Sequence, residues 1–229
     1  MTHGRLRKRI IILFGIGSRP CSRKNRGLAG CHEMAIQRMP VIPAQQMRSR
    51  RTYDRLIAAI TASAADGTLS TLTLPQLAKR AGVSTGAFYG RFSGKAAAVA
   101  AVLERQQAAL RSRLSLLGAQ ARPTRDVRGW IESLAKAMAA YERGVVPLVR
   151  VLIGEGATLP DPVSSDPGLR REAGLLLAEW GVVREAEAES RAGFVLTLIG
   201  SMTRDAALHG RKADLKGIET AALWYLSAP

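Results

Sequence analysis

The residues with the most specific spacing lie in segment 71–95, TLTLPQLAKRAGVSTGAFYGRFSGK. Apolar residues recur at the start of this segment at helical spacing, which predicts a first short helix: Leu74, Leu77, Ala78 and Ala81. Gly82 then supplies a turn at which a side chain is unfavourable. Ser84 can cap the next helix by accepting a hydrogen bond from its free amides. The pattern predicts two short helices joined by a tight turn.

The second of these helices has an apolar back and a small, polar or basic front. The back comprises Ala87, Phe88 and Phe92, and the front comprises Thr85, Gly86, Tyr89, Gly90 and Arg91. A short helix with such a front suits insertion into a DNA major groove. Lys95 stands where a following helix begins, so its ammonium group and that helix start can both meet a phosphate. Tyr89 and Arg91 can reach phosphates on either side of the groove.

Positive charge is concentrated in the same half of the chain. The net charge of the 229-residue chain is +16. Residues 1–47 hold 9 Lys and Arg against 1 acidic residue, residues 48–115 hold 11 against 3, and residues 116–229 hold 14 against 14. A polyanionic partner near segment 71–95 explains this asymmetry, and the neutral remainder reads as a separate folded domain.

Segment LAKRAGVSTGAFYGRFSGK resembles the DNA-binding signature of the tetracycline-repressor-like (TetR) transcriptional regulators. The matching residues follow in order and without gaps: Leu77-Ala78, Ala81-Gly82-Val83-Ser84, Gly86, Phe88-Tyr89, Phe92 and Lys95. The resemblance is strong over about residues 50–105. It implies an all-helical homodimer with an N-terminal DNA-binding domain and a C-terminal domain that senses a small molecule. Two departures are Pro75, where a polar or basic contact residue is common, and Gly90, a helix-interior glycine in place of an aromatic residue or histidine.

Basic residues also crowd the start of the preceding helix, where they oppose the helix dipole and folding alone gives no reason for them: Arg48, Arg50, Arg51 and Arg55. The expected partner is double-stranded DNA with a roughly palindromic operator. The expected DNA-binding residues are Arg51, Thr73, Ser84, Thr85, Gly86, Ala87, Tyr89, Gly90, Arg91 and Lys95.

The chain divides into three parts by composition. Residues 48–94 are the expected helix-turn-helix domain, and residues 95–229 are the expected helical ligand-binding and dimerisation domain. Residues 1–47 are either a basic, disordered arm that follows DNA phosphates or a stretch upstream of the true translation start. Cys21 and Cys31 fall in this stretch as reduced thiols, and no second Cys/His pair completes a metal site, so we expect neither metal nor cofactor.

The rest of the chain shows helical patterns without a strand, which predicts an all-α fold. The first helix is expected over residues 48–65 and the fourth over 95–117. Thr124 is the expected N-cap of the next helix. The remaining helices are expected over 125–142 (ended by Gly144), 146–154, 168–180, 184–208 and 213–226.

The last two helices are apolar on more than one side, so each must bury two faces. One face covers the domain itself, and the resemblance implies that the other pairs with a second copy, through Leu198, Met202, Ile218, Leu223 and Trp224. The candidate ligand-pocket residues are Trp130, Met138, Tyr141, Arg150, Trp180 and Phe194. An apolar pocket with one arginine suits a hydrophobic or weakly anionic compound.

Catalysis has no residues to support it. The histidines pair with no serine or cysteine in a catalytic spacing, and no apolar run is long enough to span a bilayer. We therefore expect a cytoplasmic transcriptional repressor that a small-molecule effector releases from DNA. The alternative is a non-sensing DNA-binding protein, or an activator, of the same fold.

Overall fold

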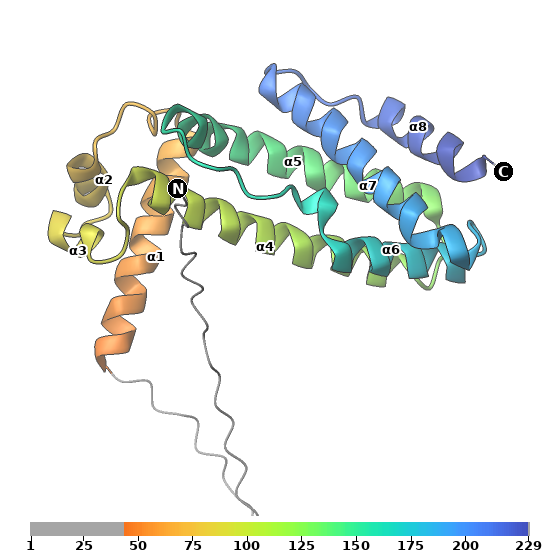
Figure 1. The fold of residues 1–229 in the computed structure, drawn as a ribbon, viewed down its shortest axis with the longest axis horizontal. Coiled ribbons are helices and arrows are strands. Elements are labelled where there is room, and N and C mark those ends of the chain that lie inside the picture. The colour runs from red at the N-terminus through yellow and green to blue at the C-terminus, as the bar shows by residue number, and fades with distance from the viewer. Residues whose placement is uncertain (1–43, 229) are drawn as a thin grey trace, which may run out of the picture. The chain divides into compact units, whose positions relative to one another are not determined.

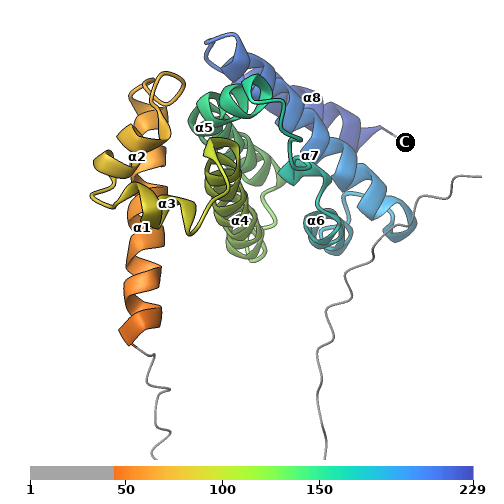
Figure 2. The same cartoon turned by 60° about the vertical axis from the view of Figure 1, so that its left-hand side comes forward.

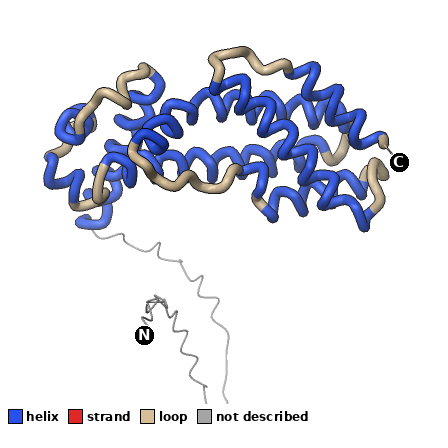
Figure 3. Tube along the Cα trace, turned by 45° about the horizontal axis from the view of Figure 1, so that its top comes forward, coloured by secondary structure: helices blue, strands red, loops and turns tan. Residues whose placement is uncertain are grey.

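The computed structural model describes residues 44–228, with side chains from residue 49 onward, and this part of the chain is helical (Figures 1 and 3). The predicted all-α fold is confirmed, because residues 44–228 contain eight α-helices and no strand. The predicted extension falls largely outside these residues. The helices are α1 (Ala44–Ala65), α2 (Leu74–Arg80), α3 (Thr85–Tyr89), α4 (Lys95–Ala121), α5 (Val127–Gly154), α6 (Pro167–Glu179), α7 (Glu185–Leu208) and α8 (Leu215–Ser227), with a 3-10 turn, η1, at Val163–Ser165.

The first hydrophobic core lies under the short helices α2 and α3. Phe88 of α3 is fully buried in it, against Leu77 of α2, Ile60 of α1 and the first turns of α4. The last turns of α5 also enter this core, through residues Val145, Leu148, Val151 and Leu152. Helix α3, the candidate for contacting DNA, therefore packs on helices that continue into the rest of the protein.

The second core is built by the remaining lengths of α4 and α5 together with α6, α7 and α8 (Figure 2). Leucine, isoleucine and alanine fill most of it, and Trp130 is its largest buried side chain. Tyr141 of α5 packs against both cores. Helices α4 and α5 thus contribute side chains to both cores and connect the two.

Helix α5 corrects the prediction of two helices over 125–142 and 146–154. It is one continuous helix from Val127 to Gly154, with Pro147 inside it and Gly144 not at its end. Proline lacks the amide that would donate to the carbonyl four residues earlier, and glycine weakens a helix. Burial of Val145, Val146 and Leu148 on either side of these residues overrides that local preference.

Two smaller differences concern helix ends. Helix α4 extends to Ala121, one turn beyond the predicted Leu117. Asp126, and not Thr124, caps α5, because the Asp126 carboxylate accepts a hydrogen bond from the Gly129 amide at 3.0 Å. Within residues 44–228 no helix has both the length and the apolar character needed to cross a membrane.

Candidate nucleic-acid interface

The turn between α2 and α3 is built by the residues that the sequence singled out. Gly82 adopts φ +65°, the left-handed conformation that glycine tolerates best. The amide of Val83 closes the turn by donating to the Ala78 carbonyl at 3.0 Å. The Ser84 hydroxyl accepts from the Ala87 amide at 3.1 Å, which confirms it as the N-cap of α3. These contacts fix the angle at which α3 leaves α2.

Gly82→Ala is expected to lower the free energy of unfolding by about 1–2 kcal/mol, because a side chain strains the left-handed conformation. No atom lies within 4 Å of the added Cβ, so the effect is conformational and not steric. Gly86→Ala is the matched control, because Gly86 is helical and its replacement stabilises α3 by up to about 1 kcal/mol. Urea unfolding without DNA measures the change in the free energy of unfolding for each variant. A change of the same sign in both variants would contradict this account of the turn.

Helix α3 presents one face to the core and the other to solvent. Phe88 is buried and packs against Phe92, with ring centroids 5.6 Å apart. Tyr89 is 55% exposed on the opposite side, and Gly86 is exposed beside it. Gly90 is the C-cap of α3, so the predicted helix-interior position of this glycine is wrong. The exposed face carries no acidic residue.

Among the residues that the structure describes, two cations next to α3 have only neutral partners. Arg91 donates to the Ser49 hydroxyl at the start of α1, and Lys95 Nζ donates to the Ser70 carbonyl oxygen at 3.0 Å. Their charges are therefore not compensated by an acid. By contrast, Arg105 pairs with Asp54 at 2.9 Å. The bond from Arg91 also brings the basic start of α1 beside the end of α3.

The loop between α1 and α2 is held by an ionised carboxylate. Asp66 accepts hydrogen bonds from the side chain and amide of Thr68 and pairs with Arg80 of α2. The Thr68 hydroxyl is the largest cause that lowers the pKa of Asp66 to about 2, followed by the Arg80 hydrogen bond. The Asp66 carboxylate is consequently ionised at physiological pH and offsets part of the charge of Arg80.

The other DNA-binding candidates occupy several kinds of position. Arg51 is exposed on α1, two residues after Ser49 and therefore on a different face of the helix from the Ser49 hydroxyl that Arg91 contacts. Thr73 is exposed but already engaged in capping α2, because its amide donates to Gln76 Oε1 at 2.7 Å. Thr85 and Ala87 on α3 are partly exposed. The structure thus gathers most of the candidates on or directly after α3, whereas Arg51 lies on α1 and Thr73 stands at the start of α2.

The ligand-pocket candidates are not gathered at one place. A cavity of about 160 Å³ lies among α4, α5, α6 and α7, and Trp130 is the one candidate in its wall. Arg150 is exposed and donates to the Leu208 carbonyl at 3.0 Å. Phe194 is exposed and stacks on Tyr225, with centroids 4.0 Å apart. Trp180 meets Trp130 edge to face at 5.7 Å but does not line the cavity.

The remaining two pocket candidates belong to the core. Met138 is buried, and Tyr141 is partly buried beside Glu142. Burial is the main cause that raises the pKa of Tyr141 to about 12, and the Glu142 carboxylate adds to it. Tyr141 therefore stays protonated at physiological pH. The apolar residues that form most of the cavity wall were missed, because nothing in their spacing distinguishes them from other core residues: Leu114, Leu134, Leu169, Leu176 and Leu196.

The dimer-interface candidates divide between surface and core. Trp224 is 74% exposed on α8, and Met202 is exposed on α7. Leu198 and Leu223 are partly exposed. Ile218 is fully buried within its own subunit, so its predicted place in the interface is wrong. The broad apolar arc of α8 has its Ile218 side against the second core and its Trp224 side in solvent.

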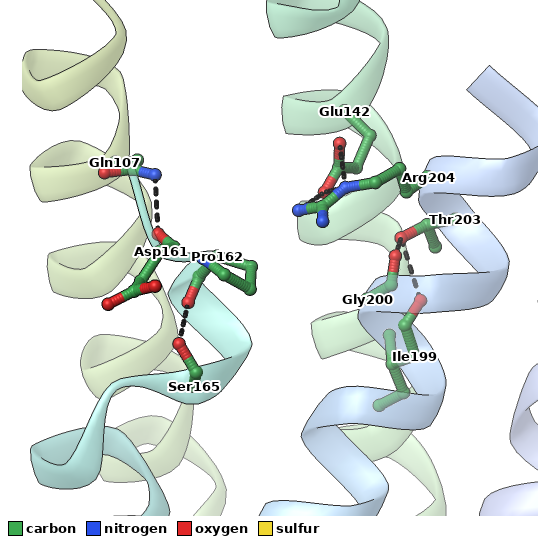
Figure 4. Close-up of polar contacts among 9 residues, drawn as sticks. All are labelled: Gln107, Glu142, Asp161, Pro162, Ser165, Ile199, Gly200, Thr203 and Arg204. Atoms are coloured by element: carbon green, nitrogen blue, oxygen red, sulfur yellow. Dashed lines mark hydrogen bonds and ion pairs between the residues drawn. The ribbon is translucent and has the colours of Figure 1, made fainter. Parts of the chain in front are cut away.

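A polar group between α5 and α7 was not predicted from the sequence. The Glu142 carboxylate is buried and accepts from Arg204 Nε and Nη2 at 3.0–3.3 Å (Figure 4). Nearby, Gln107 of α4 donates to the Asp161 carbonyl at 3.0 Å. Within residues 44–228, no group of three or more metal-ligating side chains forms a metal site.

Comparisons with known proteins give a family match for the helix-turn-helix segment. Residues 56–102 match the model of the bacterial regulatory proteins of the tetR family. A protein from Mesorhizobium loti assigned to the TetR-family transcriptional regulators aligns over 78% of this chain and 95% of its own, with 14% identity and a TM-score of 0.57. No curated protein matches the sequence.

Two further solved structures resemble the chain. The fatty acid degradation regulator FadR from Bacillus halodurans aligns over 77% of this chain and 98% of its own, with 16% identity and a TM-score of 0.50. A transcriptional regulator from Rhodococcus sp. Rha1 aligns over 76% of this chain and 93% of its own, with 23% identity and a TM-score of 0.46. The family match lies on α1 to α4, where the helix-turn-helix and its buried support are found.

Proposed function

We propose that the chain is a TetR-family transcriptional repressor that a small molecule releases from DNA. The match of its helix-turn-helix segment to the family model and the similarity of its fold to a solved regulator support this proposal. The observation that carries the proposal is the two-sided helix α3, with Phe88 buried behind it and Tyr89 exposed in front. This makes α3 a reading helix for the major groove. The protein then acts in the cytoplasm, where its DNA is, and the proposal assigns it no reaction.

Cations beside α3 supply the backbone contacts. Arg91 and Lys95 exchange their neutral partners, Ser49 and the Ser70 carbonyl, for phosphate oxygens of higher charge. Arg51 reaches the backbone from the start of α1. Arg80 and Arg105 contribute less, because Asp66 and Asp54 already offset part of their charge.

A homodimer supplies the second reading helix. The exposed aromatic and apolar side chains of α7 and α8 form the proposed subunit contact: Phe194 and Met202 on α7, and Trp224 on α8. Aromatic anchors of this kind dominate the affinity of protein interfaces. Two copies of α3 then meet successive major grooves on one side of a roughly palindromic operator.

Release from DNA follows from the path of α5. Its first half carries Trp130 in the cavity wall, and its second half carries Leu148 and Leu152 in the core beneath the reading helices. A ligand that fits the cavity better in one arrangement of α4 and α5 shifts the population toward that arrangement. If the favoured spacing of the two α3 helices differs from that of the operator, the ligand weakens DNA binding.

The phosphate contacts give a direct test of DNA binding. Arg51→Ala and Lys95→Ala are each expected to weaken binding to operator and random DNA alike, and to lower the slope of log affinity against log salt by about 1. Fluorescence anisotropy at several salt concentrations measures both quantities, on fragments selected from the parent genome. Arg171→Ala, on the exposed surface of α6, is the control with the same loss of charge.

Equal salt slopes for all three variants would contradict the assignment of these contacts. A protein that binds its selected fragments with an affinity that no effector changes would instead support the non-sensing alternative. Increased transcription from the bound promoter would identify an activator.

A further inference from the structure

The cavity among α4, α5, α6 and α7 has an apolar interior and a polar edge. Its volume of about 160 Å³ is close to the roughly 150 Å³ of an apolar cavity that takes up benzene. Leucine side chains and Trp130 form most of its wall. The polar lining residues Ser115, Arg122 and Glu172 are wholly or partly exposed, so they mark the edge of the cavity. The interior therefore fits a single hydrocarbon ring, and the edge determines which polar substituent is favoured.

Glu172 is the charged residue at this edge that lacks a charged partner. Its carboxylate accepts a hydrogen bond from the Ser115 hydroxyl at 2.7 Å, and this bond between α6 and α4 holds the carboxylate at the cavity. Among the residues that the structure describes, this hydroxyl is the one polar partner of Glu172. A single hydroxyl uses only part of the acceptor capacity of a carboxylate, so the rest is open to a donor on a ligand.

The cation at the same edge is already paired, because Arg122 contacts the Glu179 carboxylate at 2.9 Å. An anionic ligand would have to compete with Glu179 for Arg122, and Glu172 would repel it. A cationic ligand would instead gain the attraction of the Glu172 carboxylate. The weakly anionic compound expected from the sequence depended on Arg150, which does not line the cavity. The charges at the cavity edge therefore favour a cation.

From this arrangement we infer that the cavity binds a one-ring compound that carries a protonated amine, with the ring among the leucines and the ammonium group beside Glu172. An ammonium group has several N–H donors, so one can bond the carboxylate while the others stay hydrated at the edge. Burial of the ring supplies most of the affinity, and the ion pair supplies the preference for a cation. The inference rests on the proposed function only in calling this compound the effector.

A pair of probes with the same ring tests the role of the charge. Benzylamine carries an ammonium group where ethylbenzene carries a methyl group. In Glu172→Gln we expect the ratio of their dissociation constants, benzylamine over ethylbenzene, to rise about twofold to fivefold relative to the unchanged protein, as for the loss of one exposed ion pair. Glutamine keeps the length of the side chain and an acceptor for Ser115. The difference in hydration between the probes is common to both proteins and cancels in this comparison.

Glu104→Gln is the matched control, because Glu104 is also exposed but lies on α4 outside the cavity lining. Its ratio should equal that of the unchanged protein. Added salt should weaken the binding of benzylamine in the unchanged protein more than in Glu172→Gln. A ratio that is unchanged in Glu172→Gln, or raised equally in Glu104→Gln, would overturn the role of Glu172. Failure of the full-length protein to bind benzylamine would overturn the ligand class.

Gly118→Ala tests whether the probes occupy this cavity. The added methyl group would lie 3.6 Å from Leu176 and 4.0 Å from Trp130 Nε1, so it narrows the space between two wall residues without a clash. We expect both probes to bind more weakly while their ratio stays that of the unchanged protein, and unchanged affinity for both would contradict the site.

All these titrations are made without DNA, which separates this inference from the proposed function. A protein that shows the expected change in ratio but binds no DNA would support the cavity assignment and contradict the proposed function. A protein that binds DNA but not benzylamine would overturn the cavity assignment alone.

Discussion

Replacing Trp224 with aspartate is expected to convert the dimer into monomers and to weaken operator binding by about 30-fold to 1,000-fold. The side chain is 74% exposed on α8, within the proposed subunit contact. Truncating an aromatic anchor at an interface costs about 2–4 kcal/mol, and a carboxylate in its place adds a desolvation cost. A monomer retains one reading helix and contacts half of the operator.

Sedimentation equilibrium measures the subunit contact, and anisotropy at fixed salt measures the DNA affinity. Leu175→Asp is the control, because Leu175 is also largely exposed but lies on α6, outside the proposed contact. It should leave both measurements near those of the unchanged protein. A Trp224→Asp protein that remains dimeric would show that the subunits meet through another surface.

Replacing Arg204 with alanine is expected to lower the free energy of unfolding by about 3 kcal/mol. The carboxylate of Glu142 would then lie buried without its charged partner, which costs about 3–5 kcal/mol for a fully buried pair. We expect the lower end of this range because the Arg204 side chain is 43% exposed. Water can therefore reach the Glu142 carboxylate once Arg204 is replaced. Figure 4 shows how Arg204 reaches across from α7 to α5.

Urea unfolding measures this loss, and Arg105→Ala provides the comparison. Arg105 pairs with Asp54 on the surface, with both side chains more than half exposed, so its removal should cost less than about 1 kcal/mol. Equal losses for the two variants would mean that burial of Glu142 does not set the strength of its ion pair.

The helix-turn-helix could be predicted from the sequence because its signals are local. Gly82 and Ser84 determine the turn and the cap within a few residues, and Phe88 identifies the inner face of α3 by its spacing from Phe92. Each of these features depends on neighbours in sequence. The confirmed details of the fold are mostly of this kind.

The path of α5 could not be predicted in the same way. Gly144 and Pro147 are local signals for a helix end, whereas the helix continues because Val145 and Leu148 are buried in a core built by α1 and α4. That burial is a property of the tertiary structure. The ion pair of Glu142 and Arg204 joins residues 62 positions apart and leaves no local pattern.

The sequence also did not predict which side of α8 faces the core and which faces solvent. Ile218 and Trp224 are both large apolar residues on one helix, and periodicity alone does not say which of two apolar sides meets its own subunit. The cavity has the same origin, since its shape depends on how four helices pack. Trp130 was found as a rare aromatic residue, and its leucine neighbours were not.

Hydroxyl-radical footprinting on a fragment selected from the parent genome tests the central proposal most directly. We expect protection in two half-sites centred about 10–10.5 base pairs apart, or a multiple of that spacing, on one side of the duplex. Substitution of Thr85 at the start of α3 should change which half-site sequence is selected. Protection of a single half-site, or no selected fragment even at low salt, would contradict a dimeric regulator that reads DNA with α3.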